Sequence, residues 1–83
     1  MVKRHKAQYY HVVIERENGV FKRTTHADVG AAEKVAASLE RSTTNGQVYV
    51  FPTDKLWHQL DDRDIVALLI EAKNWNAKKQ VPV

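Results

Sequence analysis

The longest helical pattern of hydrophobic positions lies near the C-terminal end of the chain, between Asp61 and Trp75. Apolar residues recur there at the spacing of an α-helix and would form one stripe. The stripe consists of Ile65, Leu68, Leu69, Ala72 and Trp75. Val66 and Ile70 widen it beyond the arc that a sheet can cover, so their burial would need a second surface. That surface could be another helix, a second copy of the chain or a binding partner.

Two segments rich in aromatic and β-branched residues, 8–17 and 20–25, flank Asn18-Gly19. Asn-Gly between two such segments is the strongest short-range signal of a β-hairpin, because a type I′ turn needs positive φ at both central positions. A two-residue loop would pair Glu17 with Val20. This register predicts Glu15 opposite Lys22 and His11 opposite His26.

The same register sorts the hairpin side chains onto two faces. The face expected to meet the core carries Tyr10, Val12, Ile14 and Phe21, together with Arg16, Arg23 and Thr25. The other face carries Tyr9, His11, Val13 and Glu15 beside Lys22, Thr24 and His26. The sequence therefore predicts that His11 and His26 are exposed strand residues.

A second amphipathic helix is predicted to begin near Asp28, which is a favourable N-cap residue. Its apolar stripe is rich in alanine, and small side chains allow a helix to lie close to a sheet. The stripe consists of Val29, Ala32, Val35, Ala36 and Leu39. Residues 42–46 contain turn formers that end this helix. Residues 48–51 then form the next predicted strand, which Pro52 stops.

Residues 55–60 are compatible with a fourth strand or with a short helix capped by Thr53. We favour the strand because its register separates aliphatic from aromatic side chains. One face would carry Val48, Val50, Leu56 and Leu60, and the other Tyr49, Phe51, Lys55 and Trp57. The predicted fold class is therefore α+β: a two-layer domain with an antiparallel sheet of two hairpins and two helices, in the order ββαββα.

Length and composition place the chain among small globular domains. Its 83 residues, 43% of them hydrophobic, predict a single domain over 1–83 with basic flexible ends at 1–7 and 77–83. Cysteine is absent, which excludes disulfides and thiolate chemistry. The sequence has neither a long apolar run nor a signal-peptide pattern, so we expect a cytoplasmic protein without a membrane partner.

The net charge of +3 depends on the ends of the chain. Residues 7–77 contain eight basic and ten acidic side chains, so the folded body is not basic. A nucleic-acid-binding function would use the leader and the first hairpin, where counterion release would make binding depend on salt. The residues for this alternative are Lys3, Arg4, Lys6, Lys22 and Arg23.

No residue pattern in the sequence indicates catalysis. His11 and His26 lack a third ligand at zinc-binding spacing, and His58 is expected to be a partly buried core residue. The acidic cluster at 61–64 is explained by helix capping and the helix dipole. The sequence has no nucleophile elbow and no glycine-rich phosphate loop. We therefore expect no enzymatic activity, no cofactor and no bound metal.

The aromatic residues Tyr49, Phe51 and Trp57 near Lys55 have two interpretations. Aromatic side chains on a sheet face can stack on unpaired bases or contact a partner. Alternatively, the C-terminal helix covers this face and the aromatic side chains belong to the core. The second interpretation is favoured because a chain of this length needs large apolar side chains in its core.

The layout resembles that of several very small phage proteins. The segment Tyr10-His11-Val12-Val13-Ile14-Glu15-Arg16-Glu17-Asn18-Gly19 precedes an alanine-rich helix from Gly30-Ala31-Ala32, and Val48-Tyr49-Val50 and a closing hairpin follow. Over residues 8–60 this order is similar to some type I-F anti-CRISPR proteins and to unrelated small bacterial domains. The resemblance to the phage inhibitors implies non-catalytic binding to a host nucleoprotein complex, in the cytoplasm of a bacterial host if the chain is phage-derived.

The sequence thus favours a small binding protein that contacts a protein or nucleoprotein partner, with direct nucleic-acid binding as the alternative. A homodimer through the C-terminal helix is a further expectation, since symmetric dimers are the commonest oligomers. The candidate partner-binding residues are Val66, Ile70, Trp75, Tyr49, Phe51 and Trp57.

Overall fold

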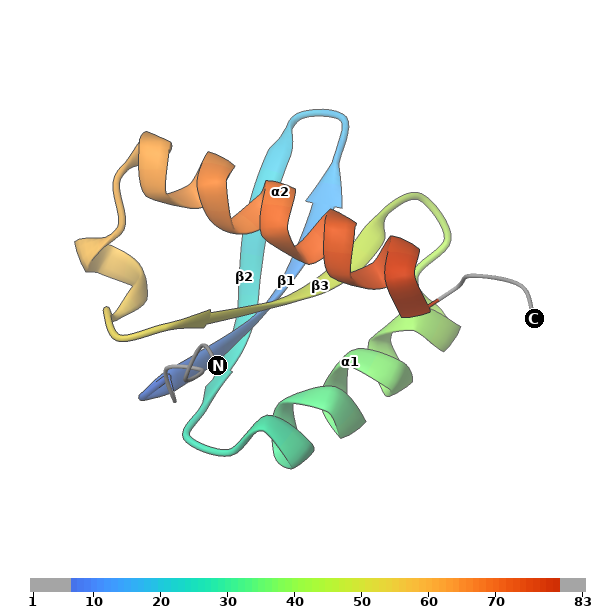
Figure 1. The fold of residues 1–83 in the computed structure, drawn as a ribbon. Helices are drawn as coiled ribbons and strands as arrows, with labels where there is room; N and C mark the ends of the chain where they lie inside the picture. Colours follow the sequence, from blue (N-terminus) through green and yellow to red (C-terminus); the bar gives the residue numbers. More distant parts are fainter. Residues whose placement is uncertain (1–6, 80–83) are drawn as a thin grey trace.

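The computed structural model describes residues 7–79, with the side chains of 75–79 left undescribed. The chain forms β1 (Tyr9–Arg16), β2 (Gly19–His26), α1 (Val29–Ser42), β3 (Gln47–Thr53), a 3₁₀ turn (Trp57–Gln59) and α2 (Asp62–Lys79). Figure 1 shows α2 crossing in front of the strands. The basic leader at 1–6 and residues 80–83 lie outside the described part. The helix α2 continues to Lys79, whereas the sequence predicted a flexible end from residue 77.

The sheet is antiparallel with β1 at its centre, in the order β2-β1-β3. Alternate side chains of β1 face opposite sides, and a helix covers each side. Val12 and Ile14 pack in one cluster with Ala32 and Ala36 of α1. On the other side, Val13 packs in a second cluster that contains Ala72 of α2. The domain therefore has three layers, with the sheet between α1 and α2, and the predicted two-layer arrangement is wrong.

The predicted hairpin is present, but its register differs from the predicted one. The loop consists of Glu17 and Asn18, so Arg16 lies opposite Gly19 and Glu15 lies opposite Val20 instead of Lys22. Among the described residues no non-glycine residue has positive φ, and Gly19 has φ 140°. Asn18 therefore does not adopt the backbone that a type I′ turn at Asn-Gly requires.

A bulge at the level of Val12 and Val13 changes the register again. Val13 pairs with Lys22 and Val12 pairs with Thr24, which leaves Arg23 as the extra residue of β2. His11 consequently lies opposite Thr25, and the predicted pairing of His11 with His26 is wrong. Thr25 therefore shares a face with His11 instead of with Tyr10.

The segment between β3 and α2 forms a 3₁₀ turn, so the predicted fourth strand is absent from residues 7–79. Side-chain acceptors stabilise this turn: Thr53 Oγ1 accepts the Lys55 N–H at 3.3 Å, and Gln59 Oε1 accepts the Leu56 N–H at 2.9 Å. The β3 strand thus remains at the sheet edge, where Pro52 can lie within it. The alternative of a short helical turn was the better interpretation, although Thr53 is not its N-cap.

The first helix begins as the sequence predicts. Asp28 is its N-cap, and the Asp28 carboxylate accepts the Ala31 N–H at 3.0 Å. In the loop before β3, Gly46 fits where a side chain would not. A Cβ at this position would lie 2.9 Å from the Glu15 carbonyl oxygen and 2.9 Å from Ile14 Cγ2. Gly46 therefore permits the close return of the chain to β1.

Candidate protein-binding surface on α2

Two aspartates fix the start of α2 through reciprocal hydrogen bonds. Asp61 Oδ1 accepts the Asp64 N–H at 2.8 Å, and Asp64 Oδ2 accepts the Asp61 N–H at 3.3 Å. The Lys55 ammonium also lies 3.3 Å from Asp64 Oδ2. The Asp61 N–H and the Lys55 ammonium together hold the pKa of Asp64 below its ordinary value. These contacts fasten the connection before α2 to the first turn of the helix.

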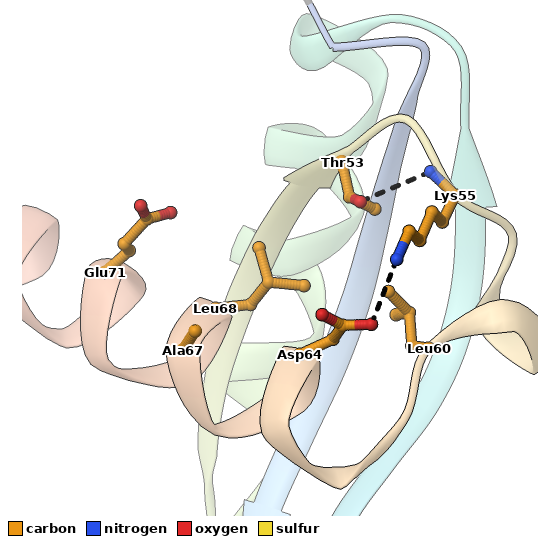
Figure 2. A pocket seen from close by; sticks show the side chains of 7 residues that line it. All are labelled: Thr53, Lys55, Leu60, Asp64, Ala67, Leu68 and Glu71. Atoms are coloured by element: carbon orange, nitrogen blue, oxygen red, sulfur yellow. Dashed lines mark hydrogen bonds and ion pairs between the residues drawn. The ribbon is translucent and has the colours of Figure 1, made fainter.

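A small hollow lies between this connection, the end of β3 and α2. Its volume is about 180 Å³. The lining residues are Thr53, Lys55, Leu60, Asp64, Ala67, Leu68 and Glu71. Figure 2 shows Lys55 and Asp64 joined on one side of the hollow and Glu71 farther along α2. The hollow therefore combines an apolar wall with two carboxylates and one ammonium group.

Glu71 differs from Asp64 in its surroundings. Among the side chains that the structure describes, residues 7–74, none forms a hydrogen bond or ion pair with the Glu71 carboxylate. The seven positions from Asp64 to Glu71 correspond to about 10 Å along a helix. Glu71 therefore lies about two helical turns beyond Asp64 on the same side of α2. Glu71 is consequently an exposed carboxylate beside an apolar wall, and Lys55 does not neutralise it.

The outward side of α2 presents two aliphatic side chains to solvent. Val66 and Ile70 are each 54% exposed. They border a shallow depression together with Asp62, Arg63 and Ala67. Ala67 also lines the hollow described above, so the two features adjoin on one helix. The structure thus confirms that Val66 and Ile70 lie outside the packed stripe of α2.

The packed stripe of α2 covers the aromatic residues of β3. Tyr49 and Phe51 are buried in the same cluster as Ala72, and Ile65, Leu68 and Leu69 pack against them. Trp57 lies half-buried beside Phe51, with ring centroids 6.4 Å apart. Tyr49 and Phe51 therefore belong to the core, and α2 would have to leave the sheet before a partner could reach them. The Trp75 side chain lies outside the described residues.

His11 is the buried polar side chain that the sequence analysis missed. It is fully buried, with Nδ1 2.8 Å from Thr25 Oγ1 and Nε2 2.9 Å from the Lys55 carbonyl oxygen. Burial and the nearby positive charge of Lys22 lower the pKa of His11, against an opposing effect of the Lys55 carbonyl. The uninterrupted sequence Val12-Val13-Ile14 was the available signal, because such runs are typical of strands buried on both faces.

The other described histidines are placed differently. His58 is exposed, so the prediction of a partly buried His58 is wrong, because the segment that contains it is a turn and not a strand. His26 lies at the end of β2, where Nε2 is 2.9 Å from Thr24 Oγ1. In residues 7–79 no group of three or more His, Asp or Glu side chains is arranged to hold a metal ion.

The candidate nucleic-acid residues are only partly within the described chain. Lys3, Arg4 and Lys6 lie outside it. Lys22 and Arg23 are both exposed on β2, and neither forms an ion pair within residues 7–79. The structure thus places two adjacent cationic side chains at an edge of the sheet.

Comparison with known proteins gave no relatives: no protein-family model, no curated protein and no solved structure matches this chain. Within residues 7–79, neither helix has the length and hydropathy needed to cross a membrane.

Proposed function

We propose that this chain is a non-catalytic binding protein that contacts a protein or nucleoprotein partner through the outward side of α2. The observation that supports this proposal is the exposure of Val66 and Ile70 on one face of the helix. Residues at i and i+4 are neighbours on a helix surface, so the two side chains form one apolar patch. Covering such side chains contributes up to about 1.5–3 kcal/mol each.

The size of the hollow beside α2 supports macromolecular binding over metabolite binding. Pockets that enclose small-molecule ligands usually measure about 300–1,000 Å³. The hollow measures about 180 Å³, which suits a single side chain of a partner. The neighbouring depression at Val66 and Ile70 is larger, about 390 Å³, but it is open and apolar, as expected of a surface that another surface covers and not of a pocket that encloses a ligand.

The most specific form of the proposal is a phage-type inhibitor of a host defence nucleoprotein complex. Its support is the resemblance of the first hairpin, the alanine-rich helix and the following strand to the layout of type I-F anti-CRISPR proteins; the closing hairpin of that layout is absent from residues 7–79. A plaque assay tests this form: the chain is expressed in a bacterium with an active type I-F system, which is infected with a targeted phage. Restored plaque formation is expected, and unchanged restriction at verified expression would reject the inhibitor function.

Capture of a partner tests the broader proposal. The wild-type chain and a Val66→Glu/Ile70→Glu variant are used as baits in bacterial lysate, with Ala37→Glu on the exposed side of α1 as the matched control. We expect a stoichiometric protein with the wild type and the control and not with the double variant, because an apolar interface cannot desolvate two charges. Equal recovery with the double variant, or turnover of a small molecule without any partner, would contradict the proposal.

Sedimentation equilibrium separates a foreign partner from a second copy of the chain. If the wild type is a dimer and the Val66→Glu/Ile70→Glu variant is a folded monomer, the patch serves self-association. A wild type that stays monomeric at high micromolar concentration rules out the homodimer.

Direct nucleic-acid binding is the second candidate, favoured by Lys22 and Arg23 on β2, which are exposed and form no ion pair among the described side chains, residues 7–74. Labelled DNA and RNA are titrated at two salt concentrations with wild type, a Lys22→Glu/Arg23→Glu variant and a chain lacking residues 1–6. Affinity should fall with salt by a log-log slope of about 0.9 for each phosphate neutralised on duplex DNA. Unchanged affinity after both alterations would exclude this function.

A further inference from the structure

We propose that the partner places a lysine or arginine side chain in the hollow beside α2, next to apolar side chains that cover Val66 and Ile70. This inference rests on the proposed function and adds the chemistry of the partner. The hollow would be the specific part of the surface, and the apolar patch would supply contact area.

The shape and lining of the hollow fit a long basic side chain. Leu60, Ala67 and Leu68 form an apolar wall, and the space is about 180 Å³. Lysine and arginine bury their methylene groups along apolar surface while the charged end reaches a polar group. A single extended side chain therefore suits this space.

The charges around the hollow favour a cation. Asp64 is already bound by the Asp61 N–H and by the Lys55 ammonium, whereas the Glu71 carboxylate has no partner among the described side chains, residues 7–74. The two carboxylates and one ammonium leave the lining with a negative charge. An acidic side chain would be repelled by Glu71, so charge complementarity selects a basic one.

The chain itself shows how a lysine occupies this hollow. The Lys55 side chain extends along it and places its ammonium 3.3 Å from Asp64 Oδ2 (Figure 2). A lysine of the partner would bind in the same manner at Glu71, about 10 Å farther along the helix. The Lys55–Asp64 pair would then form one end of the site.

The position of Ala67 links the hollow to the apolar patch, because this residue lines both features. A partner that covers Val66 and Ile70 therefore has its neighbouring residues directly above the hollow. We infer that the recognised segment combines one or two large apolar residues with an adjacent lysine or arginine.

Titration with amino-acid analogues, followed by NMR, tests the inference without knowledge of the partner. The probe is N-acetyl-lysine N′-methylamide, and the control is the norleucine analogue, which has the same aliphatic chain but no ammonium. We expect saturable shifts of Ala67, Leu68 and Glu71 amides with the lysine probe at millimolar concentration. The Glu71→Gln variant should bind it about two- to fivefold more weakly, as for an exposed ion pair.

The matched control is Glu40→Gln on the exposed end of α1, which should not alter the titration. Equal shifts with the lysine and norleucine probes, unchanged affinity in Glu71→Gln, or shifts that map elsewhere would overturn the inference. Its failure is distinguishable from that of the proposed function. Loss of partner capture in Val66→Glu/Ile70→Glu would support the proposed function. If, in the same experiments, Glu71→Gln captures the partner normally and the lysine probe does not bind, only the inference about the basic side chain fails.

Discussion

The two faces of the sheet use alternate residues of the same strands but are packed in different ways. The α1 face is aliphatic, with Ala32 and Ala36 against Val12 and Ile14. The α2 face combines the aromatic residues of β3 with a fully buried histidine. Small buried alanines of α1 line the first contact, whereas leucines and an isoleucine of α2 pack around Ala72 in the second. The face with the larger side chains is also the face with the candidate binding features.

The largest expected effect is on the aromatic face. Phe51→Ala removes a fully buried ring and should lower the free energy of unfolding by about 3–5 kcal/mol. A chain of this length has about 4–12 kcal/mol in total, so the variant should be marginally folded. Urea denaturation followed by circular dichroism measures the loss. Phe21→Ala is the control. Because Phe21 is 45% exposed, this substitution should lower the free energy of unfolding much less. Similar losses for both variants would show that the α2 face is not a tightly packed core.

The next effect concerns the buried alanines between α1 and the sheet. Ala36→Leu should reduce the free energy of unfolding by about 1–3 kcal/mol, because the larger side chain does not fit between α1 and the sheet. The neighbouring exposed Ala37→Leu and the hollow-lining Ala67→Leu should change it by less than about 0.5 kcal/mol. Calorimetric melting of the three variants checks this. A stable Ala36→Leu variant would mean that the α1 face has unfilled space.

The N-caps allow the two helices to be compared with the same substitution. Asp28→Ala removes the acceptor for the Ala31 N–H, and Asp61→Ala removes the acceptor for the Asp64 N–H. Each substitution should lower the free energy of unfolding, measured by urea denaturation, by about 0.5–2 kcal/mol. Asp28→Asn keeps a capping oxygen and should be nearly neutral. Only Asp61→Ala should also weaken binding at the hollow, since it loosens the segment that holds Lys55 near Asp64.

The smallest effect at neutral pH involves His11. Its pKa in the folded chain is lowered from 6.5, so the unfolded chain binds the proton more strongly. The contribution of neutral His11 to the free energy of unfolding is therefore fully present above about pH 6.5. This contribution is lost as the pH falls toward the lower pKa of the folded chain. The groups that face His11 are Thr25, the Lys55 carbonyl and the Lys22 ammonium. The free energy of unfolding of the wild type should therefore be lower at pH 5.5 than at pH 7.5.

Two variants separate this effect from other titrations. His58→Gln should keep the pH dependence, because His58 is exposed. His11→Gln should flatten it. The lowered pKa of Asp64 acts in a different window, since its stabilisation is lost only as the pH falls below the ordinary value of 3.8. An unchanged slope in His11→Gln would show that His11 is not the group responsible.

The elements with strong local signals could be predicted from sequence. Asp28 specified the start of α1, and the apolar spacing after Asp61 specified α2. The exposure of Val66 and Ile70 also followed from that spacing, because they lie beside a stripe already wide enough to cover a sheet. These predictions depend on interactions within a few residues along the chain.

The parts that depend on distant contacts could not be predicted. The bulge at Arg23 changed which residue faces His11, and no local pattern in β2 indicates it. The burial of His11 depends on Thr25 and on the carbonyl of Lys55, 44 positions away. Residues 55–60 alternate like a strand but form a turn, because side-chain acceptors from Thr53 and Gln59 satisfy their backbone. The hollow arises from the same turn and was therefore also missed.

The bulge at Arg23 has a consequence for the behaviour of the chain at high concentration. An exposed strand edge is a template for fibril growth, because it offers regularly spaced backbone donors and acceptors. On β2, the extra residue at Arg23 interrupts that spacing, and the adjacent Lys22 adds charge. At the opposite edge, Pro52 of β3 has no N–H to donate. Both open edges of this small sheet thus resist the addition of strands from neighbouring molecules.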